Sequence, residues 1–165
     1  MSRAEKSTST RNAIIDATRD LFFAQGYKST TIRQITEKAN VLNGTLYHFF
    51  KDKEQILLQI VIDAYGELMT VADDIIGNES DPALRFAVIY LLEMKAIQKY
   101  PNIAELYLES YSSWRITDEL HPLNVNRNKQ FFGCFNDDFR QMDYHMITLA
   151  LRGMKLVFIS ERINI

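Results

Sequence analysis

The stretch NVLNGTLYHFFKDKEQIL, residues 40–57, decides the fold of this chain. Small and polar residues come first, and Leu46 with the Phe49/Phe50 pair then anchors a short helix predicted from Thr45 to Phe50. Asp52 is a typical N-cap with Gln55 three residues later, so a second helix begins directly behind it. A helix this short is marginal alone and must pack against a neighbour.

Two further helices precede this stretch. The pattern Ile14, Ala17, Leu21 predicts a first helix that ends at Gly26, a typical residue for that position. Thr31 and Gln34 form a capping-box pair that opens a short second helix, with Ile32, Ile35 and Ala39 on one face. Two short helices joined by a tight turn and braced by a preceding helix predict a helix-turn-helix, which places its second helix in the major groove of DNA.

The face of the third helix that does not pack carries a set of groups suited to nucleic acid. These residues are Asn43, Gly44, Thr45, Tyr47 and His48. Lys53 stands in the first turn of the following helix, where a cation opposes the helix dipole. A bound phosphate would remove that conflict, although Asp52 and Glu54 could also neutralise the charge internally.

Residues 10–57 resemble the DNA-binding region of the TetR (tetracycline-repressor) family of bacterial transcriptional regulators. The resemblance rests on TRNAIIDATRDLFFAQGYKSTTIRQI (10–35) and NGTLYHFFKDKEQIL (43–57). It implies phosphate contacts from Thr31, Tyr47, His48 and Lys53, and groove or base-edge contacts from Asn43 and Thr45. Arg33 could reach the DNA backbone or remain solvated. Tyr47 could instead pack its ring on the module, and His48 could simply be exposed; a metal role for His48 is not expected, because His121 and His145 share no ligand spacing with it.

Three positions depart from the family pattern. Asn40 stands where the turn usually has Gly, and Asn tolerates the left-handed conformation. Leu42 stands where a small hydroxyl residue is usual, so Asn43 is expected to cap the third helix instead. Thr36 replaces an Ala, and its hydroxyl is expected to bond to a backbone carbonyl.

The remaining chain also reads as helical, which makes the fold class all-α, with a helix-turn-helix head at 1–51 and a larger helical body at 52–165. The fourth helix runs to Gly77, and Asp81-Pro82 starts a fifth, which is apolar nearly all round between Phe86 and Leu92 and so expected to be buried on most sides. Tyr100-Pro101-Asn102 breaks that helix and starts another that carries Trp114. A loop is expected at Leu120–Asn128, then a seventh helix marked by Phe131, Phe135 and Phe139, and an eighth capped by Asp143.

The body is expected to bind an effector and to dimerise, as the resemblance implies. The aromatic and soft residues expected to line a ligand pocket, with one carboxylate, are Tyr90, Glu93, Met94, Tyr107, Tyr111, Trp114, Phe131 and Phe135. Plain core packing is the alternative for each aromatic residue, and Glu93 and Glu109 could bind a cationic or hydroxylated ligand or face water.

The last helix offers Ala150, Gly153, Met154 and Val157 on one side, for a second subunit or for a buried intrachain contact. The family generally adds one more helix beyond it, whereas the sequence ends at Ile165; either the tail of the protein is missing from this sequence, or dimerisation through a smaller surface is expected.

Composition supports these expectations. The net charge is −2, but residues 1–55 carry nine Lys/Arg against six Asp/Glu, and the rest carries ten against fifteen. The single Cys134 and the polar N-terminus predict a reducing, cytoplasmic setting, and no membrane helix is expected. No nucleophile elbow, phosphate loop or HExxH motif is present, so neither an enzyme nor a cofactor is expected. The sequence thus predicts a regulator, expected to be a repressor of palindromic operators, released by a small hydrophobic or aromatic effector; a helical protein-binding adaptor is the alternative.

Overall fold

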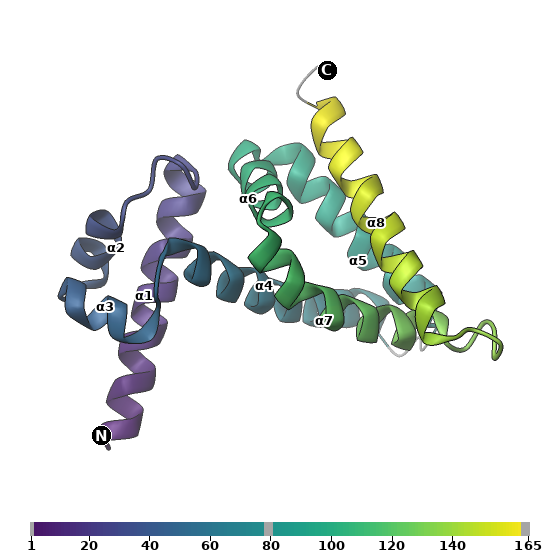
Figure 1. The fold of residues 1–165 in the computed structure, drawn as a ribbon, viewed down its shortest axis with the longest axis horizontal. Coiled ribbons are helices and arrows are strands. Elements are labelled where there is room, and N and C mark those ends of the chain that lie inside the picture. The colour runs from purple at the N-terminus through teal and green to yellow at the C-terminus, as the bar shows by residue number, and fades with distance from the viewer. Residues whose placement is uncertain (1, 78–80, 163–165) are drawn as a thin grey trace.

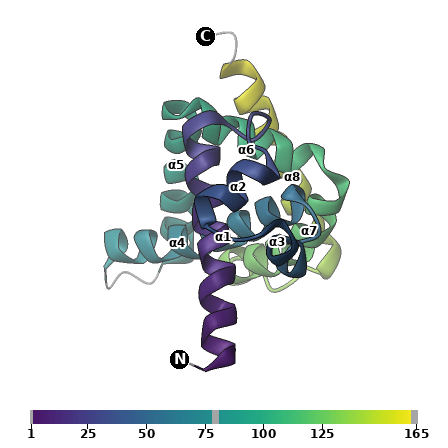
Figure 2. The same cartoon turned by 90° about the vertical axis from the view of Figure 1, so that its left-hand side faces the viewer.

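The computed structural model describes residues 2–77 and 81–162, which form eight helices. Three make up the head: α1 (Arg3–Gln25), α2 (Ile32–Ala39) and α3 (Asn43–Phe49). Five make up the body: α4 (Lys53–Ile76), α5 (Pro82–Lys99), α6 (Pro101–Ser112), α7 (Trp114–Phe132) and α8 (Gln141–Arg162). Figure 1 shows the head at one end, with α4 leading into the body and α7 running beside it. Figure 2 views the same arrangement from the end that carries the head.

Four local signals at helix ends behave as predicted. Gly26 ends α1 with φ 83°, and Thr31 caps α2 in a full capping box with Gln34. Asp52 caps α4 through the Gln55 amide at 2.8 Å, and Asp81 caps α5 ahead of Pro82. Each of these signals depends only on residues at most four positions apart, which is why the sequence alone locates them.

One hydrophobic core holds the head together and continues into the body. Phe22 and Ile14 of α1 are fully buried with Ile35 of α2 and Leu46 of α3. The same cluster includes buried side chains from α4, α6 and α7: Ile56, Leu57, Ile60, Leu106 and Ile116. The boundary between residues 51 and 52 therefore separates the expected DNA-binding head from the expected effector-binding body, but one hydrophobic core includes residues of both.

The third helix begins differently from the prediction. It starts at Asn43 and ends at Phe49, and Leu42 is its N-cap, with no side-chain cap bond. The prediction that Asn43 caps this helix is therefore wrong. The Asn43 Oδ1 lies 2.9 Å from the Thr36 hydroxyl, which also lies 3.0 Å from the Arg33 carbonyl as expected. Asn43 is thus engaged with α2, and Asn40 occupies the left-handed turn at φ 54° as predicted.

The expected loop at Leu120–Asn128 is wrong, because α7 runs through it without interruption and contains Pro122. Ser113 caps this helix through the Ile116 amide at 3.1 Å. Buried Val125, Asn128 and Phe131 then hold one face against the rest of the body, so tertiary packing outweighs the poor helix propensity of this segment.

Other boundaries in the body also differ. Phe131, Phe135 and Phe139 do not share a helix, because α7 ends at Phe132 and α8 begins at Gln141. Trp114 belongs to α7 instead of α6, since Ser113 separates them. Asp143 lies inside the first turn of α8, where its carboxylate accepts the Arg140 amide proton at 2.7 Å.

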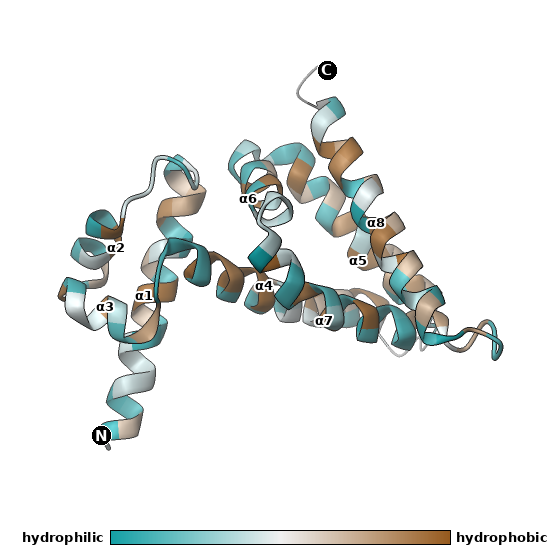
Figure 3. Ribbon diagram, viewed as in Figure 1, coloured by the Kyte–Doolittle hydropathy of each residue, from teal (hydrophilic) through white to brown (hydrophobic). Residues whose placement is uncertain are grey.

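The α5 helix is less enclosed than its composition suggests. Between Phe86 and Leu92 only Ile89 is buried, and Leu91 is 58% exposed. Figure 3 shows apolar residues along several helices, α8 among them, and Met154 and Val157 of α8 are more than half exposed. The α4 helix has the length and hydropathy to cross a membrane, which is weak evidence because the core helix of a globular body meets the same test.

Replacing Pro122 by Ala should stabilise the protein. Proline inside a helix removes one backbone hydrogen bond and crowds the carbonyl four residues earlier. Alanine restores the hydrogen bond and relieves the crowding. The free energy of unfolding in urea should rise by about 1 kcal/mol or more. Glu119→Ala, at another exposed position of α7, is the matched control and should have little effect. A loss of stability in Pro122→Ala would contradict the prediction and show that the fold depends on the proline.

Candidate nucleic-acid interface and effector cavity

The outward face of the head carries most of the predicted DNA-binding residues. Tyr47 is 53% exposed, and its hydroxyl makes no hydrogen bond within the described part of the chain. Asn43, Gly44 and His48 are exposed beside it, and Thr45 is partly exposed. A Cβ added to Gly44 would meet nothing within 4 Å, so no other part of the protein covers this position of α3.

Two predicted residues of α2 share this surface. Thr31 is exposed, although its hydroxyl already accepts a hydrogen bond from the backbone amide of Gln34. The Arg33 side chain is 84% exposed and bonds to Glu37 at 2.7 Å. An exposed pair of this kind contributes little stability, so a phosphate can compete for the guanidinium.

Lys53 is held more tightly than the others. Its ammonium donates to the carbonyls of Tyr27 and Thr30, both at 2.7 Å, and lies 4.1 Å from the centre of the Tyr27 ring. These carbonyls relieve the conflict with the helix dipole that an external anion would otherwise have to relieve. Desolvation lowers the pKa of Lys53, and burial, helped by Glu54 and Glu109, raises that of Tyr27 to about 12.

The head is tied to the body at two places. The Glu105 carboxylate of α6 accepts the backbone amides of Tyr27 at 3.2 Å and Lys28 at 3.1 Å. Asn102 donates to the Phe23 carbonyl at 2.8 Å, and Lys28 pairs with Glu109 at 3.1 Å, so Glu109 faces the head.

The second tie lies at the start of α4. Arg115 of α7 bonds to Asp52 at 2.7 Å and to Glu54 at 3.2 Å, and the Ser113 hydroxyl also bonds to Glu54. Desolvation opposes ionisation of Asp52, but bonds from Arg115 and the Gln55 amide lower its pKa overall. The residues that cap α4 therefore also contact the first turn of α7.

A cavity of about 650 Å³ lies inside the body, with walls from α1 and all five body helices. Four predicted ligand-binding residues line it: Tyr90, Glu93, Tyr107 and Tyr111. Four others do not. Met94 and Phe131 belong to the hydrophobic clusters, whereas Trp114 and Phe135 are 80% and 57% exposed.

Glu93 is buried at 3% exposure and is fully engaged within the protein. One carboxylate oxygen pairs with Lys155, and the other accepts the Tyr107 hydroxyl at 3.1 Å. Burial, assisted by Glu93, raises the pKa of Tyr107 well above 10. Because its charge is already compensated, Glu93 is poorly placed to bind a cationic ligand.

Several lining residues were missed by the sequence analysis, among them Tyr65, Arg127 and Lys155. Arg127 was missed because its segment was taken for a loop. Arg127 lies on the inward side of α7 with Ile116, Leu120 and Phe131, at steps of four, seven and four residues, and this is the helical signal that the Asn and Pro residues obscured.

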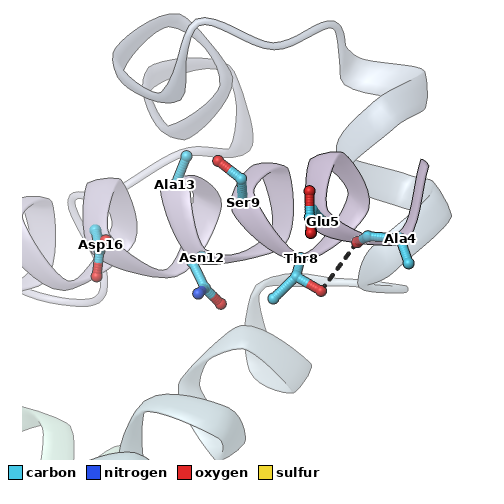
Figure 4. A pocket seen from close by; sticks show the side chains of 7 residues that line it. All are labelled: Ala4, Glu5, Thr8, Ser9, Asn12, Ala13 and Asp16. Atoms are coloured by element: carbon cyan, nitrogen blue, oxygen red, sulfur yellow. Dashed lines mark hydrogen bonds between the residues drawn. The ribbon is translucent and has the colours of Figure 1, made fainter. Parts of the chain in front are cut away.

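Two other features do not add to the site. A surface hollow along α1, lined by residues 4–16, receives all its side chains from that one helix, as Figure 4 shows. His121 and His145 approach to 2.8 Å, away from His48, and the described residues contain no group of three metal-ligating side chains.

Comparison with known proteins agrees with this arrangement. Residues 14–60 match the model for bacterial regulatory proteins of the tetR family. The transcriptional repressor KstR2 of Mycolicibacterium smegmatis is 29% identical over 90 residues, which cover 54% of this chain and 44% of that protein. The transcriptional regulator HbdR of Aromatoleum sp. is 47% identical over 60 residues, covering 34% and 26%. This chain thus spans about half the length of the curated relatives it matches.

The fold extends the likeness beyond the head. The crystal structure of RolR in complex with resorcinol superposes with a TM-score of 0.73 and 24% identity, covering 98% of this chain and 83% of RolR. The relatives named here are transcriptional regulators, which gives no support to the adaptor alternative.

Removing the Lys53 ammonium should destabilise the head. Lys53→Met leaves the Thr30 carbonyl without its donor, while the Tyr27 carbonyl keeps the backbone amide of Thr30, and an unsatisfied, partly buried acceptor costs about 1–3 kcal/mol. Urea denaturation followed by circular dichroism measures the difference. Lys51→Met removes an exposed lysine nearby and is the control; equal stability of the two variants would mean that the carbonyl contacts contribute nothing.

The N-terminal segment of the chain, residues 14–60, thus matches the tetR family of bacterial regulatory proteins, and the fold of the chain as a whole resembles that of RolR.

Proposed function

We propose that the chain is a DNA-binding transcriptional regulator of the bacterial cytoplasm, acting as a repressor of palindromic operators and not as an enzyme. The observation that carries the proposal is the uncovered outer face of α3, where Asn43, Gly44, Tyr47 and His48 are exposed while Leu46 is completely buried. A short helix held rigidly by one face and polar on the other suits insertion into a major groove. Thr31, Arg33 and Thr45 extend the same surface.

Arg33 is the cation we assign to a phosphate. Lys53 already serves two carbonyls, so its third proton is the part of it available to DNA. Phosphate contacts position the protein without reading sequence, whereas Thr45 and Asn43 are the groups we assign to base edges.

Two heads would be needed for a palindromic operator, and α8 offers the surface to pair them. Its outward side leaves exposed Met142, Met146, Leu149, Ala150, Gly153, Met154, Val157 and Phe158. The alternative of a buried intrachain contact does not fit Ala150, Gly153, Met154 and Val157, because all four are exposed. We propose that this face joins two copies of the chain in a homodimer.

The cavity in the body is the proposed effector site. Its volume and its wall of tyrosines and aliphatic side chains suit a small hydrophobic or aromatic molecule. RolR, a protein of similar fold, was solved in complex with resorcinol. The ties from α6 and α7 to the head provide a physical route by which filling the cavity would tilt the heads and end simultaneous engagement of two half-sites.

Arg33→Gln should weaken binding to every duplex alike. Loss of one phosphate contact should flatten the slope of log affinity against log salt by about 0.9. Fluorescence anisotropy with a mixed-sequence duplex at several salt concentrations measures the slope. Lys95→Gln, at an exposed position on α5, is the matched control; an unchanged slope in Arg33→Gln would remove its assigned role, and no duplex binding by the unaltered protein at low salt would overturn the proposed function.

Met154→Asp should convert the dimer to a monomer, because it would bury two charges at the centre of the α8 face. Sedimentation velocity reports the change. Leu91→Asp introduces the same charge at an exposed apolar position of α5 and should leave the dimer intact. A dimer that survives Met154→Asp would place the interface elsewhere.

A further inference from the structure

The cavity wall carries an excess of positive charge. Four cationic side chains line it, Arg19, Arg127, Arg152 and Lys155, against two carboxylates, Glu67 and Glu93. Arg19 pairs with Glu67 at 2.9 Å, and Lys155 pairs with Glu93. Both carboxylates are therefore used, and the remaining two cations lining the cavity have no ion-pair partner in the part of the chain that the structure describes.

Arg127 is the one of these two that lies in an aromatic setting. Its guanidinium carbon lies 3.4 Å from the centre of the Tyr65 ring, and it makes no hydrogen bond within residues 2–77 and 81–162. Burial lowers the pKa of Arg127, which shows that desolvation of this cation outweighs the favourable influence of Tyr65 and Glu93. A planar group with five donors thus lies half-buried on the cavity wall, with no acceptor from the described part of the protein.

The groups near Arg127 favour an anion and not a second cation. Glu93 influences Arg127 electrostatically, but its oxygens are bonded to Lys155 and the Tyr107 hydroxyl. The hydroxyls of Tyr65 and Tyr111 make no hydrogen bond within the described residues. Burial raises the pKa of both phenols, so they remain neutral and can donate protons to an anionic group.

We propose that the effector of this cavity is a small aromatic acid whose carboxylate pairs with the Arg127 guanidinium while its ring packs among the cavity tyrosines. Arginine and carboxylate match in two parallel hydrogen bonds, which gives the ligand both charge compensation and a fixed orientation. The tyrosines around it supply flat apolar surface and hydroxyl donors. The inference rests on the proposed role of the cavity as the effector site, and it narrows the ligand from any apolar molecule to an anionic one.

The test compares matched ligands on the full chain in the absence of DNA. Benzoate and 1-naphthoate are the anionic probes, their primary amides the neutral isosteres, and benzylammonium the cationic probe, with binding measured by isothermal titration calorimetry. We expect the carboxylates to bind at least tenfold more tightly than the amides, and benzylammonium more weakly than either. Amides that equal or exceed the carboxylates would overturn the proposal without any variant being made.

A pair of variants locates the charge. Arg127→Met should abolish the preference for carboxylate over amide while neutral aromatics still bind, and Arg127→Lys should retain part of it. Lys95→Met, outside the cavity, should change neither the carboxylate preference nor the binding of neutral aromatics. Circular dichroism confirms that each variant is folded. A carboxylate preference that survives Arg127→Met would overturn the assignment.

Duplex binding, measured separately, distinguishes this inference from the proposed function. Carboxylates that bind a chain with no affinity for DNA would remove the regulator function and leave the cavity assignment standing. Release of the duplex by the amides but not by the carboxylates would overturn the cavity assignment and leave the regulator function standing.

Discussion

Burial of Phe22 and Ile14 against two helices of eight and seven residues is the interaction on which the structure depends. Neither α2 nor α3 is long enough to be stable in water, since isolated helices below about 12–15 residues are marginal. Ile35 and Leu46, both fully buried, contribute about 1.5–3 kcal/mol each by leaving water. The polar outer face of α3 can remain uncovered because its inner face is fixed so firmly.

The body applies a different constraint, in which charge is buried as well as apolar surface. Glu93 and Lys155 remain together in a nearly dry environment, where removing one partner would leave an uncompensated charge. Arg127 has no such partner in the described chain and rests on Tyr65 instead. The contrast between a compensated pair and an uncompensated neighbour gives the cavity its chemical character.

The sequence was most informative where structure is local. The caps at Thr31, Asp52 and Asp81 and the end of α1 at Gly26 follow from residues within one helical turn, and they were predicted correctly. The family signature also identified the surface of α3, although the contacts assigned to its residues remain predictions.

Prediction failed where tertiary contacts outweigh local preference. Pro122 and the neighbouring asparagines favour a loop, yet packing of Val125 and Phe131 keeps α7 helical. That error concealed Arg127. Trp114 and Phe135 were expected in the pocket because they are aromatic residues on predicted helices, but both are exposed. The ion pair between residues 93 and 155 joins two helices far apart in sequence, and no periodicity could reveal it.

The segment between α1 and α2 lies at the surface, but side chains from two other helices, Lys53 of α4 and Glu105 of α6, hold it in place. Lys53 holds the carbonyls of Tyr27 and Thr30, Glu105 holds the amides of Tyr27 and Lys28, and at Gly26 an added Cβ would lie 2.1 Å from a Glu105 oxygen. Surface connections usually accept extra residues because their backbone bonds to water. This connection should not accept an extra residue, because an insertion would move its amides and carbonyls away from Glu105 and Lys53. Its length is consequently as strictly determined as that of a strand in a sheet, and it acts as a rigid coupling between the end of α1 and the body.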